Sequence, residues 1–290
     1  AKEAAGLPHL DFKGIHCHIG SQIFDEQPFI HAAEVLLEFM DAVRTAAGIT
    51  LTELNLGGGF GIPYTKMDHP KPTGDYMRLV AGAAKEKARE LRFPFPYIVI
   101  EPGRSVVAPA GITLYTVGGI KHIPGVRDYV SVDGGMPDNP RYALYKADYT
   151  AVIANRAGEP ATDTVTIAGR CCESGDLIQE NTPLQACGAG DILAVLATGA
   201  YNYSMSSNYN RLPRPAGTAV PDGKYNVCMG YHIPVPLSQT IRRVLPLQHR
   251  LPVAPLCDGK VAVPQGFRPP HRLPFIGNGA LQCNLRILLL

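Results

Sequence analysis

The 290-residue sequence predicts an α/β fold with parallel strands up to about residue 108 and an all-β fold after it. In the first part, short apolar runs alternate with longer segments that carry apolar residues at helical spacing, which is the pattern of strand–helix–strand units. From Gly111 onwards, short β-type runs follow one another with Gly, Pro, Asn and Asp between them and no helical segment. That pattern is typical of an all-β domain.

The α/β part is predicted from three strands and two helices. The expected strands are Leu10–Ile15, Leu51–Leu56 and Tyr97–Ile100, and the expected helices are Pro28–Ala47 and Gly74–Leu91. In parallel sheets covered by helices, polar residues just past the strand ends build the site. Three groups occupy such positions here: His16 with His18, Gly57–Gly59, and Glu101–Arg104.

The all-β part is predicted from four strands: Ile112–Val117, Asp128–Val132, Thr164–Ala168 and Asp191–Ala197. The sequence shows no internal repeat at a fixed period. We therefore expect domains at residues 1–108 and 109–216, and we treat residues 217–290 as a separate tail.

The tail differs in composition from the rest of the chain. It holds 8 Lys and Arg against 2 Asp and Glu, whereas residues 1–216 hold 19 against 23, and it contains 10 of the 26 prolines and no Glu. A shift of reading frame near Gly217, with a poorly ordered tail, explains so abrupt a change better than a new domain does. The alternative is a genuine basic tail for an acidic partner, but its scattered arginines form no basic cluster.

The composition as a whole, with 46% hydrophobic and 18% charged residues, is that of a soluble globular protein. No apolar run reaches the roughly 18 residues of a spanning helix, and the N-terminus carries no signal-peptide pattern. We therefore expect a cytoplasmic protein without membrane or nucleic-acid partners. The seven cysteines are odd in number and include no C-x-x-C pair, which argues against disulfides and zinc and indicates a reducing compartment.

Two segments at strand ends could hold a ligand. His16 and His18 stand two residues apart, so an extended backbone places them on one face. This supports metal binding only weakly, because no acidic residue stands near in sequence, and hydrogen bonding to the backbone is the alternative. In Leu56–Gly61, the glycines let backbone N–H groups approach a phosphate, with a plain tight turn as the alternative.

Two further segments carry reactive side chains. Glu101 and Arg104 flank a rigid Pro-Gly turn, and the arginine fork suits a phosphate or a carboxylate, with a surface ion pair as the alternative. In Cys172–Asp176 a thiol stands beside two acids, which raise the pKa of a thiol. Cys172 therefore suits proton donation better than nucleophilic attack, unless it is simply a small core residue like its neighbour Cys171.

Taken in order, seven short motifs resemble the fold-type III pyridoxal-phosphate decarboxylases, which have an alanine-racemase-like barrel. The motifs span about residues 7–216 and follow one another at roughly the separations of that family. Seven collinear motifs are far more specific than any one alone. They are His18-Ile-Gly-Ser-Gln, Gly57-Gly-Gly-Phe-Gly, Glu101-Pro-Gly-Arg, Arg141-Tyr-Ala-Leu-Tyr, Cys172-Glu-Ser-Gly-Asp, Gly199-Ala-Tyr and Ser207-Asn-Tyr-Asn-Arg.

The resemblance implies a partial (β/α)8 barrel of the TIM type, with its later strands only, followed by a β-sandwich or Greek-key-like domain. It also implies pyridoxal 5'-phosphate as the cofactor and no metal. His18 would stack on the pyridine ring, Glu101 would pair with the ring nitrogen, and Ser21 would hold the phosphate. The family's cofactor contacts fall on His18, Ser21, Gly58, Gly59, Glu101, Gly103, Arg104 and Tyr201.

Within the family, the members that act on meso-2,6-diaminopimelate are the most similar. Their substrate contacts fall on Arg104, Arg141 and Tyr145 for the distal carboxylate, on Glu173 for the distal amine, and on Tyr201. Cys172 and His18 would be the catalytic residues, with Cys172 reprotonating the α-carbon across the interface of a homodimer. An ornithine- or arginine-type decarboxylase is one alternative, but ornithine-type enzymes typically carry Cys-Asp where this chain has Cys-Glu.

The lysine that binds the cofactor in this family lies upstream of the His18 motif, and none of the ten lysines here stands in a matching context. We therefore expect these 290 residues to be inactive alone. We also expect an unclosed barrel to expose strand edges and to aggregate. A non-catalytic paralogue is the remaining alternative; it would lose site residues in a scattered fashion, whereas every matched position is intact.

Overall fold

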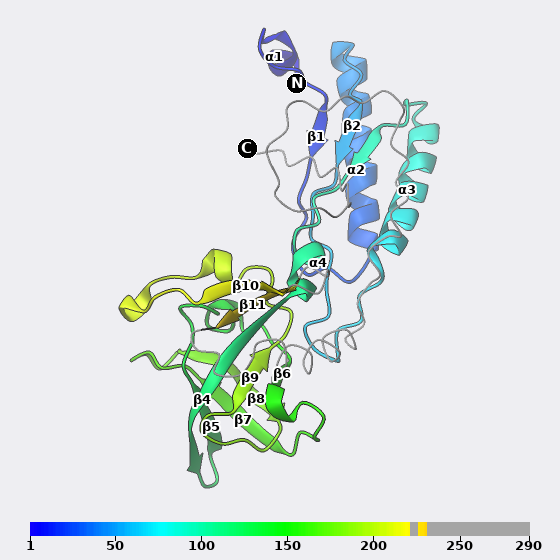
Figure 1. The fold of residues 1–290 in the computed structure, drawn as a ribbon. Coiled ribbons are helices and arrows are strands. Elements are labelled where there is room, and N and C mark those ends of the chain that lie inside the picture. Colours follow the sequence, from blue (N-terminus) through cyan, green and yellow to red (C-terminus); the bar gives the residue numbers. More distant parts are fainter. Residues whose placement is uncertain (221–225, 231–290) are drawn as a thin grey trace.

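The computed structural model describes residues 1–220 and 226–230 of the chain. Figure 1 shows two parts that lie end to end, one with short strands beside long helices and one built mainly of strands. The predicted fold class, α/β followed by all-β, is confirmed.

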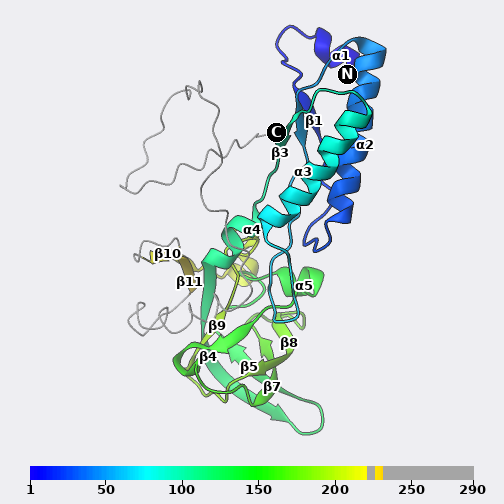
Figure 2. The ribbon, with the colours of Figure 1, turned by 90° about the vertical axis from the view of Figure 1, so that its right-hand side faces the viewer.

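The α/β part contains a parallel sheet in the order β1-β2-β3. Its strands are β1 (Gly14–His16), β2 (Glu53–Asn55) and β3 (Tyr97–Val99). Helices α2 (Gln27–Ala47) and α3 (Thr73–Glu90) lie side by side along the sheet, as Figure 2 shows. These strands and helices are the ones that the sequence predicted, at shifted ends.

Helix α2 follows its sequence pattern closely. Pro28 lies in its first turn, where a missing N–H costs nothing, and Gly48 ends it with a φ of 69°, a left-handed conformation that suits glycine. Its buried side chains recur every three or four residues and face the sheet and α3. They are Phe29, Ala33, Leu37, Met40 and Val43.

The predicted strand Leu10–Ile15 is wrong in its first half, because pairing starts only at Gly14. Leu10 is 56% exposed and has no strand beside it among the described residues, so its apolar character does not indicate a buried strand. A short helix that the sequence did not predict, α1 (Lys2–Gly6), precedes it.

The all-β part is one mixed sheet, in the order β10-β11-β4-β5-β7-β8, with β6 and β9 attached through β4. The four predicted strands are present as β4 (Gly111–Ile123), β5 (Arg127–Val132), β7 (Asp163–Ala168) and β9 (Ile192–Val195). The elements that were not predicted include β6 (Ala151–Ile153), β8 (Leu177–Leu184) and the short helix α5 (Arg141–Tyr145).

Short helical turns connect these elements: α4 (Arg104–Val107), η1 (Ala108–Ala110), η2 (Ala154–Arg156), η3 (Tyr203–Met205) and η4 (Tyr209–Arg211). Strands β10 (Ala216–Val220) and β11 (Asn226–Gly230) pair with each other, and β11 lies parallel to β4. The rest of the tail from residue 217, and with it the predicted change of reading frame and loss of order, lies outside the described residues.

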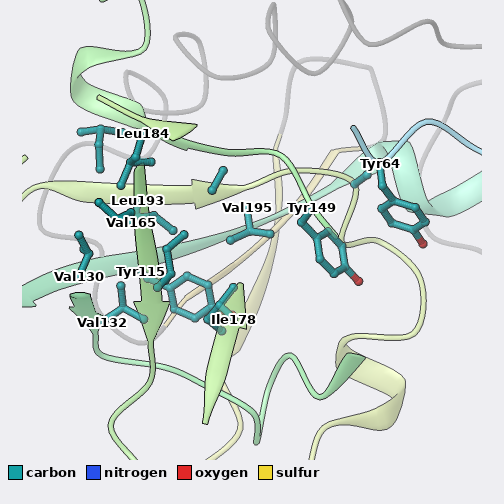
Figure 3. Close-up of a cluster of buried hydrophobic side chains, with 14 of the residues drawn as sticks. Tyr64, Tyr115, Val130, Val132, Tyr149, Val165, Ile178, Leu184, Leu193 and Val195 are labelled. Atoms are coloured by element: carbon teal, nitrogen blue, oxygen red, sulfur yellow. The ribbon is translucent and has the colours of Figure 1, made fainter. Parts of the chain in front are cut away.

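Two hydrophobic cores fill the two parts. One lies between α2, α3 and the parallel sheet, and the other lies inside the β part and is drawn in Figure 3. Ile62 and Tyr64 belong to the second core, although the loop that carries them follows β2 of the first part. This loop therefore ties the two parts together. None of the helices in the described residues is long and apolar enough to span a membrane.

Candidate active site

The glycine run after β2 allows three chain segments to approach one another. Gly57 and Gly59 have φ values of 64° and 101°, which L side chains rarely adopt. A Cβ at Gly58 would lie 2.4 Å from the carbonyl oxygen of Glu101, and one at Gly59 would lie 2.5 Å from that of Gly20. Only glycine fits at these contacts, so the run joins the segments that follow all three parallel strands.

These segments surround a cavity of about 210 Å³. The β1 end supplies His18 and Ser21, the β3 end supplies Glu101 to Ser105, and Tyr201 comes from the segment after β9. All eight residues to which the sequence assigned cofactor contacts line this cavity: His18, Ser21, Gly58, Gly59, Glu101, Gly103, Arg104 and Tyr201.

Arg104 gives one end of the cavity a positive charge. Its Nη2 donates a hydrogen bond to Ser21 Oγ at 2.7 Å and its Nη1 donates to Tyr64 Oη at 2.5 Å. The guanidinium carbon also lies 4.6 Å from the centre of the Tyr201 ring, a cation–π distance. No carboxylate of the described residues forms an ion pair with Arg104, so the charge is available to an anion.

Glu101 supplies the negative charge of the same cavity. Its Oε1 accepts a hydrogen bond from Asn55 Nδ2 at 2.7 Å, and its Oε2 lies 3.6 Å from His16 Nε2. Asn55 is buried, and its Oδ1 accepts the N–H of Gly57 at 2.9 Å. The amide thus links the carboxylate to the glycine run and fixes its position. A polar residue among the apolar ones near the end of the predicted strand Leu51–Leu56 was a signal for Asn55 that sequence reasoning missed.

His16 and His18 have different partners. His18 Nδ1 accepts the N–H of Gly58 at 3.3 Å, which leaves Nε2 to carry the proton of the neutral ring. His16 faces Glu101. No three His, Cys, Asp or Glu side chains of the described chain gather as a metal site. His18 thus has the hydrogen bond to the backbone that was the alternative to metal binding.

Arg141 lies outside this cavity and is almost fully buried, at 7% exposure. Its Nη1 donates to Tyr149 Oη at 2.7 Å, and its guanidinium carbon lies 4.9 Å from the Tyr64 ring centre and 5.5 Å from that of Tyr149. Burial opposes the charge, but the two tyrosines outweigh it and raise the pKa of Arg141. Arg141 and Tyr64 line a second cavity of about 680 Å³.

Tyr145, at the end of α5, is 63% exposed and lines neither cavity. Tyr64 is a site residue that sequence reasoning missed. It stands five residues past Gly59, in a loop whose pattern indicated no particular structure.

The Cys171–Asp176 turn also lies outside the first cavity. Asp176 is buried and accepts the N–H groups of Met136 and Cys171, both at 2.6 Å. Burial first, and Asp176 second, raise the pKa of the Cys171 thiol to about 11. Of the two acids in the turn, Asp176 therefore acts on the thiol of Cys171, and its neighbour Cys172 is exposed.

Glu173 is held by its own turn. Its Oε1 accepts the N–H of Gly175 at 3.1 Å, and this bond in particular lowers the pKa of the carboxyl. Its Oε2 accepts the hydroxyl of Tyr209 at 3.4 Å. Glu173 is thus a charged, exposed group beside the exposed Cys172.

Comparison with known proteins identifies this arrangement. Residues 1–108 match the family model of the pyridoxal-dependent decarboxylases, pyridoxal binding domain. The chain is 53% identical over 216 residues to the diaminopimelate decarboxylase of Bacillus subtilis and 49% identical over 222 residues to that of Halalkalibacterium halodurans. These matches cover 74% and 77% of this chain but 49% and 51% of the relatives, so the chain spans about half their length.

Solved structures agree. The chain is similar to diaminopimelate decarboxylase from M. jannaschii in co-complex with L-lysine, with a TM-score of 0.69, 33% identity and coverage of 79% of this chain and 51% of that one. The chain is also similar to the diaminopimelate decarboxylase from Helicobacter pylori complexed with L-lysine, with a TM-score of 0.66 and 28% identity. This match covers 83% of this chain and 56% of that one. These similarities relate the chain to the pyridoxal-dependent decarboxylases, whose pyridoxal binding domain residues 1–108 match.

Proposed function

We propose that the protein decarboxylates meso-2,6-diaminopimelate to L-lysine and CO2 with pyridoxal 5'-phosphate. The observation that carries the proposal is the first cavity, whose lining combines Arg104 and Ser21, the glycine run and Glu101. The names of the relatives support the choice of substrate.

The residues fit this cofactor. A phosphate needs positive charge and donors, and Arg104 and Ser21 offer both without a competing carboxylate among the described residues. A pyridine nitrogen needs a fixed acid, and Asn55 holds Glu101 in place. When bound, the cofactor supplies an electron sink for the charge left by CO2 loss. No residue lining the described cavity is a lysine, so the covalent anchor of the cofactor is not among them.

The roles that we propose follow from these positions. His18, held by Gly58, would cover the ring face and keep water from it. Glu101 would keep the ring nitrogen protonated. Cys172 would deliver a proton from Sγ to the α-carbon, for which an exposed thiol at the tip of a turn is suited.

The far end of the substrate carries both a carboxylate and an amine. Arg104, Arg141 and Tyr145 would bind the carboxylate, and Glu173, held ionised by its own turn, would bind the amine. Ornithine ends in an amine alone and gives two arginines nothing to bind. The pair of guanidinium groups without carboxylate partners among the described residues therefore favours diaminopimelate.

We further propose a cytoplasmic homodimer in which each subunit completes the site of the other. Cys172 and Glu173 are exposed and do not line the cavity of their own chain, which is expected if they serve a neighbouring one. Exposed apolar side chains next to Arg104 and on the segment after β9 support an interface there. They are Val106, Val107, Tyr201, Tyr203 and Tyr209. The domain boundaries at residues 108 and 216 also stay predictions.

The test is a chimera in which residues 1–216 replace the matching half of the Bacillus subtilis enzyme, assayed for CO2 release. We expect more CO2 from meso-diaminopimelate than from L-ornithine, and a loss of that preference in Arg141→Ala. Greater release from L-ornithine would overturn the substrate. An inactive chimera that still binds pyridoxal 5'-phosphate, followed by its fluorescence, would favour the non-catalytic alternative.

A further inference from the structure

Tyr64 connects the two arginines that lie in separate cavities. Its hydroxyl accepts the hydrogen bond from Arg104 Nη1, and its ring centre lies 4.9 Å from the guanidinium carbon of Arg141 and 5.7 Å from that of Arg104. Tyr64 is 4% exposed and lines the second cavity, while Arg104 lines the first. Its side chain therefore stands between two positive charges that would otherwise repel each other.

The ring of Tyr64 is held in place by a second tyrosine. Tyr149 packs edge to face on it, with ring centres 5.0 Å apart, and binds Arg141 through its own hydroxyl. Figure 3 shows both rings at the margin of the hydrophobic cluster, with their hydroxyl groups pointing away from the aliphatic side chains. The polar ends thus face the arginines while the ring carbons pack in the core.

The backbone of Tyr64 is anchored as firmly as its ring. Its carbonyl oxygen accepts both the N–H of Thr150 at 3.0 Å and the Thr150 hydroxyl at 2.8 Å, and its N–H donates to Asp68 Oδ2 at 3.0 Å. Thr150 precedes β6, so the bonds join the loop after β2 to the β part. Tyr64 cannot move without moving this junction.

We propose that Tyr64 is a positioning residue that fixes Arg104 and Arg141 relative to each other and so determines the affinity for a ligand with a second carboxylate. The hydroxyl accepts from Arg104 and also interacts with Arg141, and the ring lies against both guanidinium groups, closer to that of Arg141. The role goes beyond the contacts assigned to the arginines themselves, and it rests on the proposed function for the identity of the ligand.

Two substitutions separate the two contacts. Tyr64→Phe removes the acceptor of Arg104 and keeps the ring against Arg141, whereas Tyr64→Leu removes both. Tyr76→Phe is the matched control, because Tyr76 is also fully buried and its hydroxyl donates one hydrogen bond, to the carbonyl of Phe24, away from both arginines. Circular dichroism identifies any variant that fails to fold. If Tyr64→Leu does not fold, the comparison of Tyr64→Phe with wild-type protein tests the positioning role by itself.

The first readout is binding of meso-diaminopimelate and of L-lysine to the full chain, by calorimetry with pyridoxal 5'-phosphate present. L-Lysine lacks the second carboxylate, so the difference between the two ligands reports on that carboxylate, while any effect of Arg104 on the cofactor is common to both. We expect Tyr64→Phe to weaken the binding of meso-diaminopimelate about tenfold more than that of L-lysine, as loss of one charge-assisted hydrogen bond to the second carboxylate site would. A merely structural role would weaken both ligands alike.

The second readout needs no ligand. Phenylglyoxal modifies accessible guanidinium groups, and peptide mass spectrometry gives a rate for each arginine. We expect Tyr64→Phe to speed the modification of Arg104 more than that of Arg141, Tyr64→Leu to speed both, and Tyr76→Phe to change neither.

The two readouts distinguish the possible failures. If wild-type protein binds meso-diaminopimelate no more tightly than L-lysine, the proposed function fails, and the modification rates alone decide the role of Tyr64. If wild-type protein binds meso-diaminopimelate more tightly than L-lysine and Tyr64→Phe shows the same preference, the positioning role is wrong and the proposed function stands. Unchanged modification rates in Tyr64→Phe would likewise overturn the positioning role.

Discussion

Tyr149 illustrates how burial changes the chemistry of a single side chain. Burial raises its pKa to about 12, against an ordinary value of 10, and the nearby Arg141 only partly offsets this effect. Its hydroxyl accepts from Arg141 and donates to Asn202 Oδ1 at 3.2 Å, so it is tied to two partners in the protonated form. Ionisation of the Tyr149 hydroxyl would add a negative charge to a buried site whose hydrogen bonds are arranged around the single charge of Arg141.

This shift predicts a loss of stability at alkaline pH. The folded pKa is the higher one, so the contribution of Tyr149 is complete below pH 10 and is lost as the pH rises through about 12. We expect the free energy of unfolding to fall by roughly 2 kcal/mol more in wild-type protein than in Tyr149→Phe between pH 9 and 12. Urea unfolding of both proteins across that range measures the difference, and parallel declines would contradict it.

The Cys171–Cys172 pair shows why a sequence motif alone does not assign charge effects. The motif predicted two acids beside Cys172, and both are present in the turn. The backbone N–H groups of the turn and of Met136 determine where each carboxylate lies. Asp176 is buried against the N–H groups of Met136 and Cys171, and Glu173 bends back to Gly175. Which thiol an acid affects depends on backbone geometry that residue spacing does not contain.

At the scale of elements, the glycine run after β2 is the most constrained segment of the site. We expect Gly59→Ala to destabilise the protein by about 1–3 kcal/mol, because its φ of 101° is strained for alanine and the new Cβ would lie 2.5 Å from the carbonyl of Gly20. Binding of pyridoxal 5'-phosphate should weaken with it, since Gly59 lines the cavity.

Gly82 provides the control for that substitution. It lies within α3, exposed, and a Cβ there would meet nothing within 4 Å. Alanine has the higher helix propensity, so Gly82→Ala should stabilise the protein by up to about 1 kcal/mol. Urea unfolding of both variants gives the comparison, and equal effects at the two glycines would show that the run is an ordinary turn.

Elements with a clear period were predictable, and elements held by side-chain hydrogen bonds were not. Helix α2 and strand β4 carry long apolar patterns and appear where expected. Strand β8 reads as polar and contains Pro183, yet it forms at the end of the sheet path, where a missing N–H costs little. The side-chain oxygen of its buried Gln179 accepts the N–H of Tyr149. These positions are 30 residues apart, so no local sequence pattern predicts the contact.

The candidate site divides in the same way. Its strand-end residues His18, Glu101 and Arg104 were predictable because parallel strands bring their ends to one edge. The position of Arg141 away from that cavity was not, since it depends on how the β part packs against the loop that carries Tyr64. Local motifs therefore located the groups, and tertiary packing decided which of them meet.

At the scale of the whole molecule, the three-stranded sheet is the least protected feature. Within the described residues β1 and β3 each pair only with β2, so both have one side without a neighbouring strand. Tyr97 on β3 is 71% exposed, and Phe95 just before it is also exposed. Unpaired N–H and C=O groups beside exposed aromatic rings favour pairing with another chain.

We therefore expect the chain to self-associate through β3. A charge on an edge strand opposes such pairing, so Tyr97→Lys should reduce the species larger than the proposed dimer in size-exclusion chromatography with light scattering. Val126→Lys is the control, because Val126 is 70% exposed in the turn between β4 and β5 and adds the same charge away from this edge. If both variants associate as the wild type does, the edge is not the contact. If both dissociate equally, net charge rather than the strand governs association.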